Sequence, residues 1–280
     1  MTLNIPSHGL IRPTRAQYGV SSISAIWQRW LEEILLGISG TLNFYDDILV
    51  FAPFVSESLR ILESVFMQLL KASLKLNRSK CEFFIKSIVF LNFRIYSEGL
   101  HKLDIHIEAI VKAPKPRNLD ELRTFPGNVT YYHSFIPNFS SLTAPLRDML
   151  KRSKFQWNNE PITAYEELKS ELISDRVLVP YDPKLPVIFA TDASPVGLGA
   201  VLSHIMSNHE ERPIAYASKT LNRAELNYPQ IDKEALGVVW GVEKFFQYLY
   251  GRKFLICTDN KPISHTFAPN ALLPKFSLSG

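Results

Sequence analysis

The sequence predicts a mixed α/β (α+β) fold, and three patterns support that class. Apolar residues recur with the spacing of an amphipathic helix over 21–36 and again over 56–74. Short apolar runs of β-strand type occupy 44–51 and 82–100. Beyond residue 155, strands, a long helix and a further strand follow one another, which is typical of a mixed sheet covered by helices.

The first hundred residues combine turn signals, helices and strands. Two prolines and two glycines without sustained periodicity predict extended and turn structure over 1–20. The stretch FYDDILVF places the adjacent Asp46 and Asp47 inside an otherwise apolar run, which predicts a strand. The β-like runs of 82–100 predict a hairpin.

The middle of the chain predicts helices separated by prolines. Asn118 followed by Glu121 resembles a capping box at the start of the second helix. Pro126 lies inside that helix, where proline removes a backbone hydrogen bond and clashes with the preceding turn, so we expect a kink or a stop there. The predicted helices are 104–112, 118–134 and 138–150.

After Lys154 the pattern changes to that of a sheet with helices. A helical run precedes two strands, a long helix and another strand. Asp192 lies near the end of the strand VIFATDAS, and Asp259 ends the strand KFLICTD. The predicted elements are a helix near 160–174, strands over 187–194 and 197–204, a helix over 228–249 and a strand over 253–259.

Length and composition indicate an ordinary globular protein. The chain has 280 residues, of which 46 % are hydrophobic and 21 % charged, which suits about two domains. Cys81 and Cys257 have no C-x-x-C spacing, which argues against a disulfide framework or a zinc ribbon. No apolar run approaches the roughly 18 residues of a membrane helix, and no signal peptide pattern opens the chain. We expect an intracellular protein of the cytoplasm or nucleus, without a membrane partner.

The basic charge is concentrated in one segment. Net charge is +4, and 101–154 contains nine Lys or Arg against five Asp or Glu, which equals the whole excess. Such a segment could follow a phosphate backbone. Charge alone favours the alternative, a solvated helical surface.

The paired aspartates invite a metal-binding interpretation. An ionised carboxylate beside buried strand residues is costly unless it is paired or binds a metal. Two divalent ions about 3.5–4 Å apart, held by Asp or Glu, can stabilise the attacking and leaving oxygens of phosphoryl transfer. A hairpin turn is the alternative for Asp46 and Asp47, and the apolar flanks favour a metal-binding hairpin.

A second set of carboxylates comes from a strand, a helix and a strand. Asp192, Glu234 and Asp259 could converge over one sheet. Alternatively, Asp192 starts a turn, Glu234 lies on a solvated helix face and Asp259 caps its strand. Spacing alone leaves both interpretations open.

Several motifs resemble the reverse transcriptases of gypsy-type long-terminal-repeat retrotransposons. FYDDILVF is similar to the Y-x-D-D box of the palm, with Phe44 in place of the first Tyr. QYGVSSISAIWQR, 17–29, resembles a motif that lines the nucleotide and template site, and LNRSKCEFFIKSIVFLNFRIYSEGL, 76–100, looks like the strands that grip the primer, with Asn92 replacing Gly. The motif over 17–29 implies nucleic-acid contacts at Gln17, Tyr18, Gly19 and Gln28.

The resemblance continues to the end of the chain. NLDELRTFPGNVTYYHSFIPNFSSLTAPL is similar to the helical thumb, whose helices track the template-primer duplex. FATDASPVGLGAVL and the segment from Ile214 to Ile263 resemble the retrotransposon ribonuclease H domain, which implies that Asp192, Glu234 and Asp259 bind metal. For the basic segment it implies nucleic-acid contacts at Lys112, Lys115, Arg117 and Arg123.

The resemblance also implies the domains, cofactors and partners. The expected domains are a partial palm over 1–103, a helical thumb over 104–154 and a ribonuclease H-like domain over 155–280 that is incomplete at its C-terminus. The family uses two Mg²⁺ or Mn²⁺ ions per site. Its partners are an RNA template, a DNA primer, RNA·DNA hybrid and deoxynucleotides, with no haem or dinucleotide.

Departures from the family pattern limit the expected activity. Another palm Asp would precede Met1, the fourth acidic residue of ribonuclease H would lie beyond Gly280, and Pro126 replaces a usual Leu. We therefore expect a fragment truncated at both ends, with an inactive polymerase and uncertain ribonuclease H activity. The alternatives are a non-catalytic nucleic-acid-binding remnant, or an interaction module that uses exposed aromatics such as Tyr131 and Tyr132.

Overall fold

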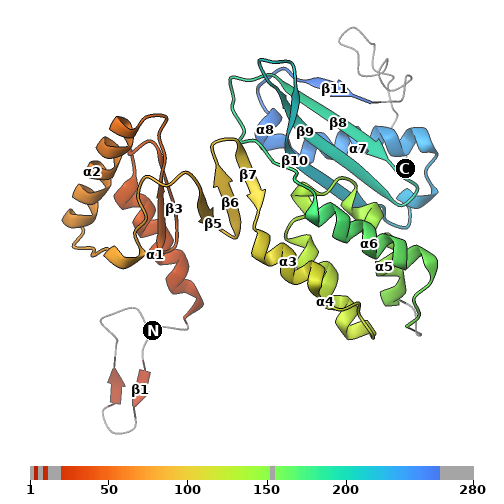
Figure 1. Cartoon of the computed structure of the whole chain (residues 1–280), viewed down its shortest axis with the longest axis horizontal. Helices are drawn as coiled ribbons and strands as arrows, with labels where there is room; N and C mark the ends of the chain where they lie inside the picture. The colour runs from red at the N-terminus through yellow and green to blue at the C-terminus, as the bar shows by residue number, and fades with distance from the viewer. Residues whose placement is uncertain (1–2, 6–8, 12–19, 152–154, 259–280) are drawn as a thin grey trace. The chain divides into compact units, whose positions relative to one another are not determined.

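The computed structural model describes residues 3–5, 9–11, 20–151 and 155–258 of the chain. Contacts within the chain divide it into two compact units, Met1–Ile85 and Lys86–Gly280, which are described separately (Figure 1). The mixed α/β class is confirmed, because helices and several sheets alternate along the chain.

The first unit packs two helices against a β-hairpin. The amphipathic helices α1 (Ser21–Leu35) and α2 (Val55–Lys71) confirm the two predicted helices. Between the two helices, β3 (Thr41–Phe44) and β4 (Asp47–Val50) pair antiparallel. Ahead of α1, β1 (Leu3–Ile5) pairs antiparallel with β2 (Gly9–Ile11). Apolar residues of the two helices form the buried core: Leu31, Leu35, Ile61, Val65 and Leu69.

The prediction of one strand over 44–51 is wrong, because a turn interrupts it. Phe44 pairs with Asp47, so Tyr45 and Asp46 form the tip of a two-residue hairpin. Tyr45 has a φ of 50°, in the left-handed region that reverses the chain tightly. Apolar flanks cannot exclude such a turn, because both hairpin strands contribute them.

The second unit begins with three short strands, so the predicted hairpin over 82–100 is extended by a third strand. These strands, β5 (Ile88–Phe90), β6 (Phe93–Tyr96) and β7 (Gly99–Lys102), pair antiparallel in that order. Asn92 has a φ of 57° in the turn between β5 and β6, and asparagine tolerates this conformation better than most residues. β7 also bridges to Leu178, which joins this sheet to the segment after the helices.

Four helices follow and share one apolar core. They are α3 (Asp104–Lys112), α4 (Leu119–Thr130), α5 (Phe139–Lys151) and α6 (Asn159–Ile173). The side chain of Asn118 accepts from Glu121 N at 2.8 Å, and Glu121 accepts from Arg117 N at 2.8 Å, which confirms the capping pattern. The most deeply buried side chains of this core are Leu122, Val129, Phe135, Ile136, Leu146 and Leu168.

Of the kink or stop expected at Pro126, the stop is wrong. Helix α4 continues through Pro126 and ends at Thr130, four residues before the predicted end at 134. Leu122, Phe125 and Val129 on both sides of the proline are buried in the core. Their packing offsets the cost of one lost helical hydrogen bond.

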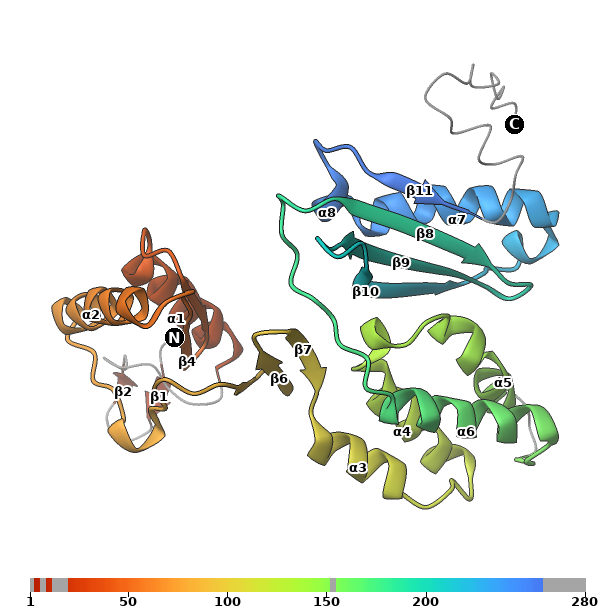
Figure 2. The ribbon, with the colours of Figure 1, turned by 45° about the horizontal axis from the view of Figure 1, so that its top comes forward.

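The last sheet is mixed and has helices packed on it. β8 (Val187–Ala193), β9 (Gly197–Ile205) and β10 (Glu211–Thr220) are antiparallel neighbours, and β11 (Leu255–Cys257) pairs parallel to β8. Helix α7 (Gln230–Lys244) packs against β8 and β9, and α5 packs against β9 and β10 (Figure 2). The short helix α8 (Phe246–Leu249) follows α7. β9 is consequently buried along most of its length.

Glycines allow α7 to approach the sheet closely. A Cβ at Gly237 would lie 3.7 Å from Thr191 Oγ1, and a Cβ at Gly241 would lie 2.7 Å from Phe189 Cε2. Since Gly237 and Gly241 are one turn apart, they share one face of α7. That face fixes the height of α7 over β8 and therefore the position of the side chains at its N-terminal end.

Candidate active site

Asp192 lies on the face of β8 opposite to α7. Side chains alternate along a strand, and Thr191 is the residue that faces Gly237 of α7. Asp192 is exposed and points to the other side, where Asn138 Nδ2 donates to its Oδ2 at 3.4 Å. The turn after β8 is organised by Ser194, whose Oγ accepts from Gly197 N at 2.9 Å. Asp192 itself is part of the strand, so the interpretation that it starts the turn is wrong.

Glu234 lies buried in the second turn of α7 and is only 5 % exposed. Gln230 Nε2 donates to Glu234 Oε1 at 2.8 Å and to the carbonyl oxygen of Ala193 at 2.7 Å. Since Ala193 follows Asp192 directly, these bonds place Glu234 beside the end of β8 that carries Asp192. The interpretation of Glu234 as a solvated helix residue is therefore wrong.

The third predicted carboxylate, Asp259, lies outside the described residues. Within the described part of the chain, no group of three or more His, Cys, Asp or Glu could hold a metal ion. Asp192 and Glu234 nevertheless supply carboxylate oxygens at one strand end, and Mg²⁺ prefers such hard oxygen ligands while keeping several waters. The donor chemistry of these two residues fits a divalent cation that takes further ligands from elsewhere.

A polar seam joins the start of α5 to the same face of the sheet as Asp192. Ser140 N donates to Ser218 Oγ at 3.0 Å, and the Oγ atoms of Ser141 and Ser194 are 2.7 Å apart. Asn138, with a φ of 48°, lies over Gly199, where any Cβ would clash with the Asn138 amide. The seam therefore sets the surroundings of the Asp192 carboxylate.

Sequence patterns missed two residues of this site, Asn138 and Gln230. Gln230 and Glu234 have the i, i+4 spacing at which helical side chains meet, so their hydrogen bond had a detectable signal. Asn138 and Asp192 are 54 residues apart in sequence, and no local pattern connects them.

Asp46 and Asp47 lie exposed at the tip of the β3–β4 hairpin in the first unit. Helix α1 braces this tip. Gln28 Oε1 accepts from Tyr45 N at 2.6 Å, and Gln28 Nε2 donates to Asn43 O at 3.1 Å. Trp27 Nε1 donates to Tyr45 O at 3.0 Å. The amide of Gln28, a predicted nucleic-acid contact, thus binds the hairpin backbone, while 17–19, the other predicted contacts in this motif, lie outside the described residues.

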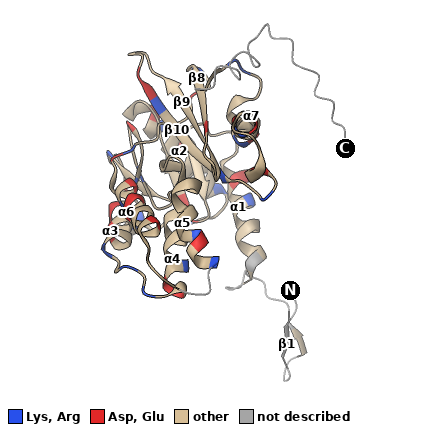
Figure 3. Ribbon diagram, turned by 90° about the vertical axis from the view of Figure 1, so that its right-hand side faces the viewer, with Lys and Arg blue, Asp and Glu red and all other residues tan. Residues whose placement is uncertain are grey.

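The predicted nucleic-acid contacts of the middle segment are exposed but mostly paired. Lys112 Nζ is 2.8 Å from Glu108, and Arg123 Nη1 is 2.6 Å from Asp120. Lys115 Nζ lies 4.3 Å from the ring centroid of Trp157, and Arg117 is exposed. Figure 3 shows basic and acidic residues interspersed on α3 and α4.

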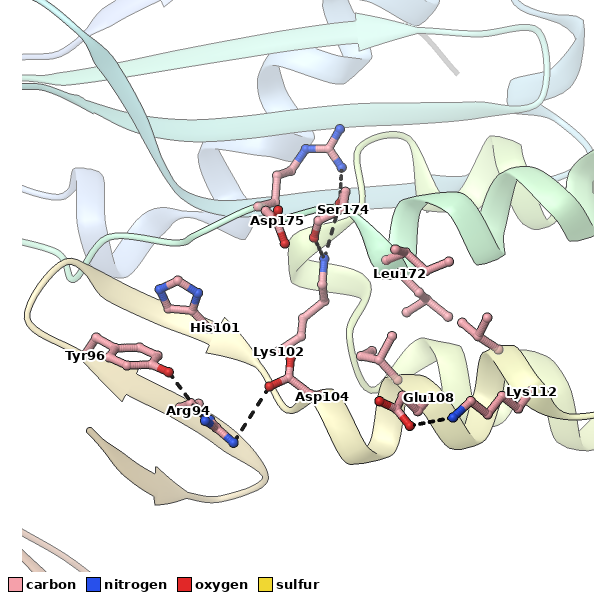
Figure 4. A pocket seen from close by; sticks show the side chains of 14 residues that line it. Arg94, Tyr96, His101, Lys102, Asp104, Glu108, Lys112, Leu172, Ser174 and Asp175 are labelled. Carbon is pink, nitrogen blue, oxygen red and sulfur yellow. Dashed lines mark hydrogen bonds and ion pairs between the residues drawn. The ribbon is translucent and has the colours of Figure 1, made fainter. Parts of the chain in front are cut away.

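A cavity of ≈ 430 Å³ in the second unit lies among β6, β7, α3 and the end of α6 (Figure 4). Lys102, which lines it, donates to Ser174 O at 2.7 Å and is 8 % exposed. Burial, together with the nearby positive charge of Arg176, lowers the pKa of Lys102 to about 8. Neither Asp192 nor Glu234 lines this cavity, so it is separate from the predicted carboxylate site.

None of the helices in the described part of the chain combines the length and apolar character needed to span a bilayer.

Comparison with protein families matches 157–256 to the RNase H-like domain found in reverse transcriptase. The chain is 38 % identical over 253 residues to the Retrovirus-related Pol polyprotein from transposon 297 of Drosophila melanogaster, covering 89 % of this chain and 23 % of that protein. It is 31 % identical over 270 residues to the Pol polyprotein from transposon gypsy of the same organism, covering 91 % and 26 %. The chain thus spans about a quarter of the length of these relatives.

Solved structures of a viral reverse transcriptase have a similar fold. The foamy viral protease-reverse transcriptase in complex with RNA/DNA hybrid matches with a TM-score of 0.75 and 25 % identity, over 92 % of this chain and 36 % of that chain. The same protein in complex with dsDNA matches with a TM-score of 0.78 and 25 % identity, over 92 % and 55 %. The carboxylates of β8 and α7 lie inside the matched domain, and the hairpin of Asp46 and Asp47 precedes it. Residues 157–256 therefore match the RNase H-like domain found in reverse transcriptase, and about nine tenths of the chain is similar to a segment of retrotransposon Pol polyproteins.

Proposed function

We propose that the ribonuclease H-like domain of this chain hydrolyses the RNA strand of an RNA·DNA hybrid, with Asp192, Glu234 and Asp259 as ligands of Mg²⁺ or Mn²⁺. The observation that carries this proposal is the position of Glu234, buried on α7 and linked through Gln230 to the strand end that carries Asp192. Carboxylate oxygens are hard ligands of the kind that Mg²⁺ prefers, so Asp192 and Glu234 have the donor chemistry that a divalent cation needs.

The domain boundaries remain part of the proposal. We assign 1–103 to the palm, 104–154 to the thumb and 155–280 to the ribonuclease H-like domain. The family match over 157–256 supports the last assignment. The contact-based division after Ile85 groups β5–β7 with the helices that follow.

The chemistry follows from the ligand set. When two divalent ions are bound, they stabilise the attacking and leaving oxygens of phosphodiester hydrolysis. Asp192 on β8 and Glu234 on α7 would supply oxygen ligands to these ions, and Gln230 restrains the Glu234 carboxylate. Asn138 restrains the Asp192 carboxylate weakly, since their distance of 3.4 Å is long for a hydrogen bond.

The nucleic-acid partner is proposed on two grounds. A structural relative binds RNA/DNA hybrid, and four cations of α3, α4 and the connection between them are exposed: Lys112, Lys115, Arg117 and Arg123. Contacts between such cations and phosphates weaken steeply as salt rises. Because Lys112 and Arg123 already pair with carboxylates, each would exchange an ion pair for a phosphate contact.

Cleavage of a labelled RNA·DNA hybrid in Mg²⁺ tests the proposal. We expect cleavage by the wild-type chain and only background cleavage by Asp192→Asn and Glu234→Gln. Glu243→Gln is the matched control, because Glu243 is an exposed glutamate of the same helix. Equal cleavage by Glu234→Gln and the wild type would contradict the proposal. Salt-sensitive binding of hybrid without cleavage would instead identify a non-catalytic nucleic-acid-binding protein.

The proposed polymerase site consists of Asp46 and Asp47, with an RNA template, a DNA primer and deoxynucleotides as substrates and Gln17, Tyr18, Gly19 and Gln28 at the nucleotide and template site. No third carboxylate joins these two aspartates among the described residues. We therefore expect no DNA synthesis by this chain alone. Primer extension on an RNA template tests this expectation, and synthesis that Asp46→Asn abolishes would contradict it.

A further inference from the structure

The amide of Gln230 is shared between a strand and a helix. Gln230 is the first residue of α7 and is exposed. Its Nε2 lies 2.7 Å from Ala193 O and 2.8 Å from Glu234 Oε1. A side-chain NH₂ group has two hydrogens to donate, so both bonds can form together.

These two bonds fix the Glu234 carboxylate relative to the sheet. Ala193 is the last residue of β8 and the neighbour of Asp192, so the bond to Ala193 O anchors the amide to the strand end. The bond to Oε1 then limits the rotation of the Glu234 side chain, which α7 and the sheet already bury.

We propose that Gln230 is a positioning residue that orients Glu234 for the divalent cation. The inference rests on the proposed function, because it requires Glu234 to be a metal ligand. Groups that hydrogen-bond to a ligating carboxylate orient it, and their loss typically lowers metal affinity or activity by about 10- to 100-fold.

The decisive variant is Gln230→Met, which keeps the length of the side chain and removes both donated hydrogen bonds. Gln247→Met is the matched control, because Gln247 is an exposed glutamine of α8 in the same domain. Mn²⁺ binding to the full chain is measured by isothermal titration calorimetry, together with the thermal midpoint of each variant. We expect Gln230→Met to weaken Mn²⁺ binding about 10-fold with little change in midpoint, and Gln247→Met to match the wild type.

A purely structural role for Gln230 predicts the reverse pattern, a lower midpoint with unchanged Mn²⁺ affinity of the folded protein, and that result would overturn the inference. A second variant, Gln230→Ala, must weaken binding in the same way. The wild type could bind Mn²⁺ more tightly than Glu234→Gln and still not cleave hybrid. In that case the proposed hydrolysis fails, but the Mn²⁺ affinities of the Gln230 variants still decide the role of Gln230. Wild-type Mn²⁺ binding that Glu234→Gln leaves unchanged would overturn both.

Discussion

Gly241→Ala tests whether the close approach of α7 to the sheet sets the geometry of the site. A Cβ at this position would lie 2.7 Å from Phe189 Cε2, even closer to Phe189 Cζ, and 3.5 Å from Ala200 Cβ. Phe189 is fully buried, so its ring has little room to move. The added methyl group must displace either the ring or the helix.

The expected magnitude follows from two opposing effects. Overpacking of a core costs about 1–3 kcal/mol, while replacing glycine by alanine inside a helix contributes about 1 kcal/mol of stability. The net change for Gly241→Ala is a loss of roughly 0–2 kcal/mol. Gly127→Ala is the matched control, because Gly127 is an exposed glycine of α4 with nothing within 4 Å of its added Cβ, and it should gain about 1 kcal/mol.

The assay compares urea unfolding midpoints of the two variants with that of the wild type. We expect opposite shifts, with Gly127→Ala raising the midpoint and Gly241→Ala leaving it unchanged or lowering it. Because Glu234 lies two turns before Gly241 on α7, Gly241→Ala should also reduce hybrid cleavage, which Gly127→Ala should not. Equal stabilisation by the two substitutions would refute the reasoning that α7 rests on Phe189.

Three further predictions concern other parts of the chain. The pKa of Lys102 is lowered from 10.5 to about 8, so between these two pH values the unfolded state binds more protons than the folded state. The free energy of unfolding should therefore rise with pH across that window. Denaturant titrations at pH 7.5 to 10 measure this rise, and Lys102→Met should remove it. Gln28→Met deletes two bonds to the β3–β4 hairpin, so hydrogen exchange at Tyr45 N should accelerate about 5- to 160-fold, as expected from a bond worth ~1–3 kcal/mol. Exchange as slow as in the control Gln68→Met would contradict the bracing role. Asn118→Ala removes the cap of α4 and should lower stability by about 1 kcal/mol, whereas an unchanged unfolding midpoint would argue against the cap.

The sequence was sufficient for the elements whose pattern is local. Helical spacing of apolar residues predicted α1 and α2, and the pair Asn118 and Glu121 predicted the start of α4. Motif order along the chain was also sufficient for the family, because each motif keeps its spacing whatever the packing around it. The strand carrying Asp192 and the helix carrying Glu234 were likewise predicted from local patterns in the sequence.

Local pattern failed where a distant partner decides the outcome. FYDDILVF is apolar on both sides of its aspartates, and only pairing of Phe44 with Asp47 and bracing by α1 show that a turn lies inside it. Pro126 signals a helix end, yet the core around Leu122 and Val129 carries α4 past it.

The sequence by itself determined that Asp192 lies on a strand and Glu234 on a helix. Only the tertiary structure decided that Glu234 is buried beside the end of β8, that Gln230 holds it there and that Asn138 meets Asp192. The physical reason is that these bonds join residues up to 54 positions apart, and their formation depends on how closely α5 and α7 pack on the sheet.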